Sequence, residues 1–168
     1  MNSPLVDAAP IITRSPEPYI AGRTEIRLLS GTHTGAAIGA IDYLIGPGFG
    51  PPPILHRHTR EDAGWFVLDG EIEFAFADGT VVRAGPGDTV VHPRGCWFRW
   101  TNPNVDRTAR AICWFSPAGF EQFFVDVATR ARDHLESGGT VETFTPTLLR
   151  LRLRYGDETH PDATIGAS

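Results

Sequence analysis

The chain has 168 residues, of which 41% are hydrophobic and 21% charged, a composition typical of a globular protein with one domain. Its net charge is −5, and all 15 basic residues are arginines scattered along the chain. Nucleic-acid binding needs a clustered basic surface, so we expect no nucleic-acid partner.

The N-terminal ten residues lack the charged and apolar regions of a signal peptide, and the longest apolar run, 36–45, is too short to span a bilayer. We therefore expect a cytoplasmic protein with no membrane partner. Cys96 and Cys113 are too few for a disulfide framework and are expected to be a reduced, buried pair. For Cys96 a structural role is favoured over nucleophilic catalysis, because the sequence places no base beside it.

Residues 1–24 contain four prolines and predict an extended N-terminal arm. Between residues 25 and 117, short apolar runs alternate with Gly/Pro turns, which is typical of an all-β domain. Asp69-Gly70 and Asp78-Gly79 predict hairpin turns, because glycine tolerates the positive φ that such turns need. The expected strands are 26–30, 37–45, 55–58, 64–68, 72–77, 80–83, 89–92, 97–101 and 109–115.

A helical segment is expected over residues 118–156. Phe120, Phe123 and Phe124 recur at helical spacing and predict an amphipathic helix from about 119 to 135, which the Ser-Gly-Gly run at 137–139 ends. A second helix is predicted to begin near Pro146. Residues 157–168 are polar and predict a flexible tail.

The most informative segment runs from Gly50 to Phe74 and reads GPPPILHRHTREDAGWFVLDGEIEF. Its two histidines, His56 and His58, are two residues apart in an expected strand, so both imidazoles project from the same face. On the inner face of a barrel, two such imidazoles can share a metal ion or a substrate proton. An isolated His-x-His pair is weak evidence, and the surrounding residues decide its meaning.

Those surroundings resemble the cupin superfamily. Gly50, five residues, His56-x-His58 and the following WFVLDGE resemble the first cupin motif, and GDTVVHPRGCWFRWTN, starting at Gly87, has the frame of the second. The order and separation of the motifs are those of cupins, and the resemblance covers about residues 28–155. It is nearest to small single-domain cupins of the quercetin-dioxygenase-like kind. It implies a mainly all-β fold, an antiparallel double-stranded β-helix or jelly-roll barrel with C-terminal helices.

The chain departs from the ligand set that this resemblance implies. Metal-binding cupins supply three histidines and one glutamate, and the positions that match the missing glutamate and third histidine are Ala63 and Phe98. Two imidazoles are fewer than transition-metal sites usually need, so we expect no cofactor. A divalent metal on His56 and His58 stays an alternative, completed by Glu61, Asp62 or His92.

Other readings stay open for these three residues. Glu61 and Asp62 are expected in a solvated turn rather than as catalytic acids. His92 either adds a third imidazole to the pocket or points to solvent, because the strand parity near Pro93 does not decide it.

The candidate catalytic residues are therefore His56, His58 and His92. Most of the aromatic residues belong to the core, and some are expected to form a wall for a ligand: Trp65, Phe74, Phe98 and Trp100. A dry, aromatic pocket keeps imidazoles neutral, and neutral imidazoles suit acid–base chemistry on a bound molecule.

Three hypotheses follow. The first is a metal-independent isomerase, cyclase or lyase that acts on an apolar or aromatic metabolite, with a role in secondary metabolism implied by the resemblance. The second is a metal-dependent, dioxygenase-like enzyme with fewer ligands. The third is a ligand-binding protein without catalysis. In each case we expect a small-molecule partner and a homodimer, formed through the N-terminal arm and the Phe-rich helix.

Overall fold

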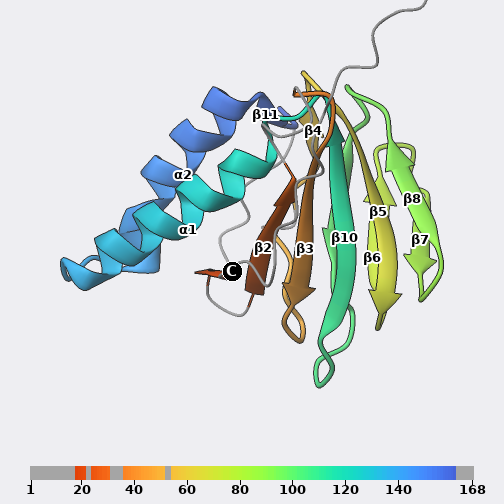
Figure 1. The fold of residues 1–168 in the computed structure, drawn as a ribbon, viewed down its shortest axis with the longest axis horizontal. Coiled ribbons are helices and arrows are strands. Elements are labelled where there is room, and N and C mark those ends of the chain that lie inside the picture. Colours follow the sequence, from red (N-terminus) through yellow and green to blue (C-terminus); the bar gives the residue numbers. More distant parts are fainter. Residues whose placement is uncertain (1–17, 22–23, 31–35, 52–53, 162–168) are drawn as a thin grey trace, which may run out of the picture.

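The computed structural model describes residues 18–21, 24–30, 36–51 and 54–161, which form two antiparallel β-sheets and two helices (Figure 1). The first sheet has the strand order β1-β2-β3-β10-β5-β8 and the second β11-β4-β9-β6-β7. The strands of the first sheet are β1 (Tyr19–Ala21), β2 (Thr24–Ser30), β3 (Gly39–Ile45), β5 (Asp62–Asp69), β8 (Thr89–His92) and β10 (Ala109–Ser116). Those of the second are β4 (His56–His58), β6 (Ile72–Phe76), β7 (Val81–Ala84), β9 (Phe98–Thr101) and β11 (Asp157–Thr159).

The core lies between the two sheets and follows the alternation of the strands. Along β10, buried residues alternate with more exposed ones, as expected for a strand with one face toward a core. One continuous cluster of buried side chains joins both sheets, with members that include Ile41, Val67, Phe74, Phe98 and Cys113. Cys113 is thus buried as expected, whereas Cys96 is only partly buried, and both are free thiols.

Each expected strand is present with bounds within two residues of the prediction. The Asp78-Gly79 hairpin is confirmed, because it joins β6 to its antiparallel partner β7. The Asp69-Gly70 hairpin is wrong. Gly70 does adopt a positive φ of 72°, but this turn carries the chain from β5 in the first sheet to β6 in the second, so the flanking strands do not pair.

Helix α1 (Glu121–Glu136) lies where it was expected, and α2 (Val141–Tyr155) begins earlier than predicted. Thr140 caps α2: its side chain accepts a hydrogen bond from the Thr143 amide, and the Thr140 amide donates one to the Thr143 side chain. This capping box starts the helix five residues before Pro146, which lies inside it.

The predicted flexible tail over 157–168 needs a correction at its start, since residues 157–159 form β11 and pair with β4. The predicted N-terminal arm over 1–24 likewise contains β1, which pairs with β2. The rest of both predictions lies largely outside the described residues.

The two helices lie side by side along one flank of the sheets (Figure 1). The Phe-rich face of α1 packs against the barrel: Phe120 is buried in the core cluster, and Phe123 and Phe124 are half-buried against it. That face is thus covered within the chain, and the expected homodimer stays a prediction that needs another surface. Neither described helix combines the length and the apolar character needed to cross a lipid bilayer.

Candidate active site

Strand β4 places two imidazoles inside the barrel. His56 and His58 are both buried, while Arg57 between them is more exposed and bonds Glu158 on β11. The register pairs β4 with β9 only at His56 and Phe98, but with β11 at all three of its residues. The orientation of the two histidines therefore depends on the C-terminal strand.

His58 forms a hydrogen bond with Glu61. Its Nδ1 lies 2.6 Å from Oε1 of Glu61, and both side chains are buried. The expectation that Glu61 lies in a solvated turn is wrong, because the turn after β4 is tight enough to fold residue 61 back onto the imidazole at position 58. A carboxylate only accepts hydrogen bonds, so Nδ1 of His58 is the donor in this bond.

Asp62 points the other way, as expected for an acidic residue in a solvated position. Its carboxylate accepts hydrogen bonds from the backbone and the guanidinium of Arg94, and these hold the pKa of Asp62 down to about 2. It is therefore the surface partner of Arg94 and takes no part in the site.

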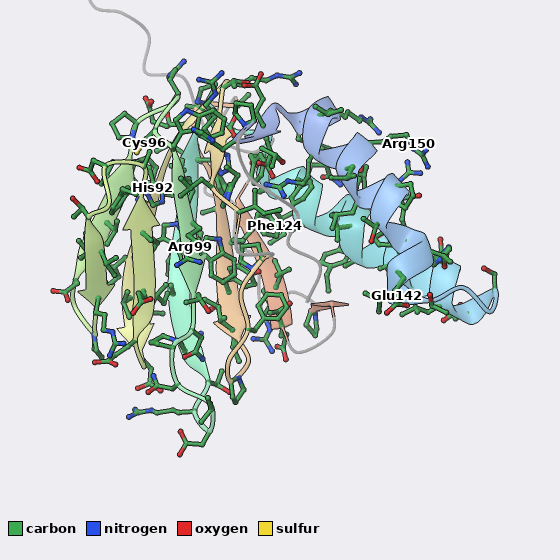
Figure 2. The ribbon with its side chains drawn as sticks, turned by 180° about the vertical axis from the view of Figure 1, so that it is seen from behind. His92, Cys96, Arg99, Phe124, Glu142 and Arg150 are labelled. Atoms are coloured by element: carbon green, nitrogen blue, oxygen red, sulfur yellow. The ribbon has the colours of Figure 1, made fainter. Side chains whose placement is uncertain are left out.

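His92 lies inside the barrel, which decides the alternative that the sequence left open. Figure 2 shows it among the strands. Its ring stacks on Phe98, with centroids 3.8 Å apart and planes 10° from parallel, and Ala63 is its cross-strand neighbour on β5. The two positions where the expected ligands are missing are thus both adjacent to His92. Neither ring nitrogen of His92 has a hydrogen-bond partner among the described residues.

Burial keeps His92 and His56 neutral. It lowers the pKa of His92 to about 3, and nearby His58 and His56 add to the shift. Burial also lowers the pKa of His56 well below its usual value; His58 and the Arg152 guanidinium contribute, and the backbone of Ile54 partly opposes them. Both imidazoles can therefore donate and accept hydrogen bonds at neutral pH.

The four candidate aromatic residues are all buried but fall into two groups. Phe98 contacts all three histidines, and Phe74 contacts His92. The rings of Trp65 and Trp100 lie 5.0 Å apart and pack against Tyr43, beyond the histidines.

Phe120 is a wall residue that the sequence analysis assigned only to a helix face. Its ring meets that of His58 edge to face at 4.1 Å, at the start of α1. Phe124, from the same helix, contacts Tyr43 and lies between the strands and α1 (Figure 2).

A buried ion pair supports β11 and was also missed. Arg152 on α2 donates two hydrogen bonds, of 2.7 and 2.9 Å, to the two carboxylate oxygens of Asp157, which faces His58 in the register. Between them, Gly156 ends α2 with a φ of 75°, and its carbonyl accepts from the amide and the hydroxyl of Thr59. A Cβ at Gly156 would lie 2.8 Å from Oγ1 of Thr59, so only glycine fits this approach.

The residues present do not form the site of three histidines and one glutamate that the resemblance to metal-binding cupins implies. Ala63 and Phe98 carry no donor atoms, so two of the four ligands that the resemblance implies are absent. Within the described ranges, no three His, Cys, Asp or Glu side chains converge closely enough to hold a metal ion. The ring of Phe98 stands instead against all three imidazoles.

Comparisons with known proteins identify the fold. Residues 43–115 match the cupin domain family, and no curated protein matches the chain. Among solved structures, KdgF from Halomonas sp. aligns with 21% identity and a TM-score of 0.52, over 61% of this chain and 88% of that one. An RmlC-like cupin from Shewanella frigidimarina aligns with 23% identity and a TM-score of 0.52, over 62% and 86% of the two chains.

Ectoine synthase from P. lautus aligns with 19% identity and a TM-score of 0.54, over 65% of this chain and 75% of that one. At these identities the likeness concerns the fold. The domain match and the shared barrel, with the His-x-His strand in its expected place, lead to one conclusion: residues 43–115 form a cupin domain, and the chain has the cupin fold.

Proposed function

We propose that this cupin is a metal-independent acid–base catalyst, of the isomerase, cyclase or lyase kind, that acts on a small apolar or aromatic molecule. The observation that carries the proposal is the buried hydrogen bond between Glu61 and His58. A carboxylate on one ring nitrogen fixes the tautomer and stabilises the imidazolium that forms when the other nitrogen takes a proton.

In the proposed step, Nε2 of His58 removes a proton from a carbon next to a carbonyl group. The electron pair of the broken C–H bond moves into an enolate, and a neutral imidazole N–H of His56 donates a hydrogen bond to its oxygen. Returning the proton to another atom completes an isomerisation, and expelling a leaving group completes an elimination. The two rings, with centroids 5.9 Å apart, are close enough to serve one small molecule.

The aromatic surroundings support this chemistry. Phe98, Phe115 and Phe120 all contact His58 and exclude water from its ring. A dry site strengthens the electrostatic interactions of the transition state. The donor set described above argues against the metal-dependent oxygenase.

The test follows proton exchange, which needs no knowledge of the natural product. The protein is incubated in D₂O with a panel of ketones, such as acetophenone, 2-tetralone and cyclohexanone, and NMR records deuterium entering the carbon next to the carbonyl. We expect exchange above the protein-free rate, a loss of about 100-fold or more in His58→Gln, and a smaller loss in Glu61→Gln. Addition of EDTA should leave the rate unchanged.

Glu158→Gln is the matched control, because Glu158 carries a carboxylate beside the same strand but bonds the outward-facing Arg57. Exchange that persists in His58→Gln, or that EDTA abolishes, contradicts the proposal. Binding of a panel member without any exchange would instead favour the non-catalytic ligand-binding protein.

A further inference from the structure

His92 is the most unusual polar side chain in the barrel. It is 2% exposed, and both of its ring nitrogens lack a partner among the described residues. Buried polar atoms in native proteins are almost always paired, and each unpaired one costs about 1–3 kcal/mol. Two unpaired nitrogens on one buried ring therefore indicate that another molecule pairs with them.

The ring neighbours of His92 cannot pair with it. Phe98 covers one of its faces at 3.8 Å, Phe74 lies 5.6 Å away, and the cross-strand residue is Ala63. None of these side chains has a hydrogen-bonding group, and the methyl group of Ala63 fills far less space than the glutamate that cupins of the metal-binding kind carry there. None of these described neighbours can therefore be the hydrogen-bond partner of His92, which leaves its ring nitrogens available to a bound molecule.

The chemistry of a neutral imidazole limits that partner. It presents one N–H donor and one lone-pair acceptor, so its ligand has to accept at one nitrogen and donate at the other, alone or through a water molecule. A hydroxyl or a carboxamide can do both, and a carbonyl can meet the N–H. A carboxylate can only accept.

The buried charges of the barrel also disfavour an anionic ligand. Arg152 is the only Arg or Lys side chain that is buried among the described residues, and both oxygens of Asp157 already bind it. Glu61 adds a buried acidic group beside His58. An anionic ligand would therefore enter without a cationic partner, and burying an unpaired charge costs several kcal/mol.

We propose that His92 is the specificity-determining residue of this site, and that it selects an uncharged molecule in which an aromatic or other planar body carries a hydroxyl, carbonyl or carboxamide group. This inference rests on the proposed function for the location of the site, and it adds the substrate class. The polar group hydrogen-bonds His92, while the planar body lies among the rings of Phe98, Phe115 and Phe120. The chain thus recognises its ligand with His92 between the two positions where metal-binding cupins carry ligands.

The test compares probes that differ only in charge and in donor capacity. Benzamide and naphthalene-2-carboxamide are each measured against the matching carboxylate, benzoate or naphthalene-2-carboxylate, by ligand-observed NMR and calorimetry at pH 7.5. We expect each carboxamide to bind at least about 10-fold more tightly than its carboxylate, and His92→Phe to weaken the carboxamides by about 10-fold, the effect of one hydrogen bond.

His134→Phe is the control, because its imidazole lies on α1 and bonds Thr143 of the helical hairpin. It should leave both affinities unchanged. The proposal is overturned if the carboxylates bind as tightly as the carboxamides, if His92→Phe leaves carboxamide binding intact, or if no carboxamide binds with a Kd below about 10 mM.

The failures of the two proposals can be told apart. Loss of deuterium exchange together with selective carboxamide binding would remove the catalytic role and keep this ligand class. Deuterium exchange without selective carboxamide binding would keep the catalytic role and remove this ligand class.

Discussion

The two sides of the barrel hold their imidazoles in different ways. On the β4 side, His58 is bonded to Glu61, and the strand is paired with β11, which the Arg152–Asp157 ion pair supports. On the β8 side, the ring of His92 contacts Phe74 and Phe98, and neither of its nitrogens has a hydrogen-bond partner among the described residues. His58 and His92 are both buried, so the difference between them is one of hydrogen bonding and not of exposure.

This contrast separates two tasks within one site. A base needs a fixed tautomer and a fixed orientation, which the β4 side supplies through its own hydrogen bonds. A group that recognises a ligand needs unpaired hydrogen-bonding atoms. His92 on the β8 side has them, and leaving them buried and unpaired lowers the free energy of unfolding. The β4 side should therefore lose stability when its polar groups are removed, and the β8 side should not.

The largest effect is expected for Asp157→Ala. It leaves the Arg152 guanidinium buried and unpaired, and breaking a buried ion pair in this way costs about 3–5 kcal/mol of the free energy of unfolding. Urea denaturation of the full chain measures it. The control is Glu158→Ala on the same strand, whose partly exposed ion pair with Arg57 should contribute less than about 1 kcal/mol.

A double variant tests the cause. Replacing both partners, Arg152→Met with Asp157→Leu, should recover much of the loss, because no unpaired charge remains. Equal losses in Asp157→Ala and Glu158→Ala would show that the buried pair adds nothing to the β4 side.

Glu61→Ala should have the next largest effect. It removes the buried acceptor of the His58 Nδ1 hydrogen bond, and an unsatisfied buried donor costs about 1–3 kcal/mol. The ¹⁵N signal of His58 Nδ1 should change at the same time, because this nitrogen loses its hydrogen-bond acceptor. Asp62→Ala, at the exposed neighbouring carboxylate, should leave that signal unchanged; a similar change in both variants would contradict the assignment.

The third effect is a dependence of stability on pH. The pKa of His92 is about 3 in the folded protein and near 6.5 in the unfolded chain, so between these values only the unfolded state binds the proton. Stability should therefore be complete above pH 6.5 and fall as the pH drops toward 3. The slope from this residue is about 1.4 kcal/mol per pH unit.

Chemical denaturation at a series of pH values measures this slope. His92→Phe should reduce it, and His134→Phe should not. An unchanged slope in His92→Phe would mean that the buried imidazole is not held neutral.

Much of the barrel could be predicted from the sequence, because its strands are defined by local alternation and by Gly/Pro turns. The motif frame also placed Ala63 and Phe98 inside the barrel, where both are buried. The predicted Asp69-Gly70 hairpin failed because a turn signal describes the local chain path and not which strands pair across it.

The rest of the site depended on contacts that no local pattern carries. Strand β11 has three residues, two of them acidic, and it is recognisable as a strand only from its pairing with β4. Glu61 looked like part of a polar turn, since its burial results from the fold of that turn onto His58. For His92, the proline that follows it obscured the strand parity on which its direction depends.

The smallest effect is expected for His92→Phe in the absence of ligand at pH 8, and its sign is the informative part. The substitution removes two unpartnered buried nitrogens and keeps a ring of similar shape against Phe98, so stability should stay the same or rise by up to about 1 kcal/mol. If the polar atoms of His92 stabilised the fold, replacing the residue would lower the free energy of unfolding. Thermal and urea unfolding measure the change, and a loss above about 1 kcal/mol would show that His92 supports the barrel as the polar groups around β4 do.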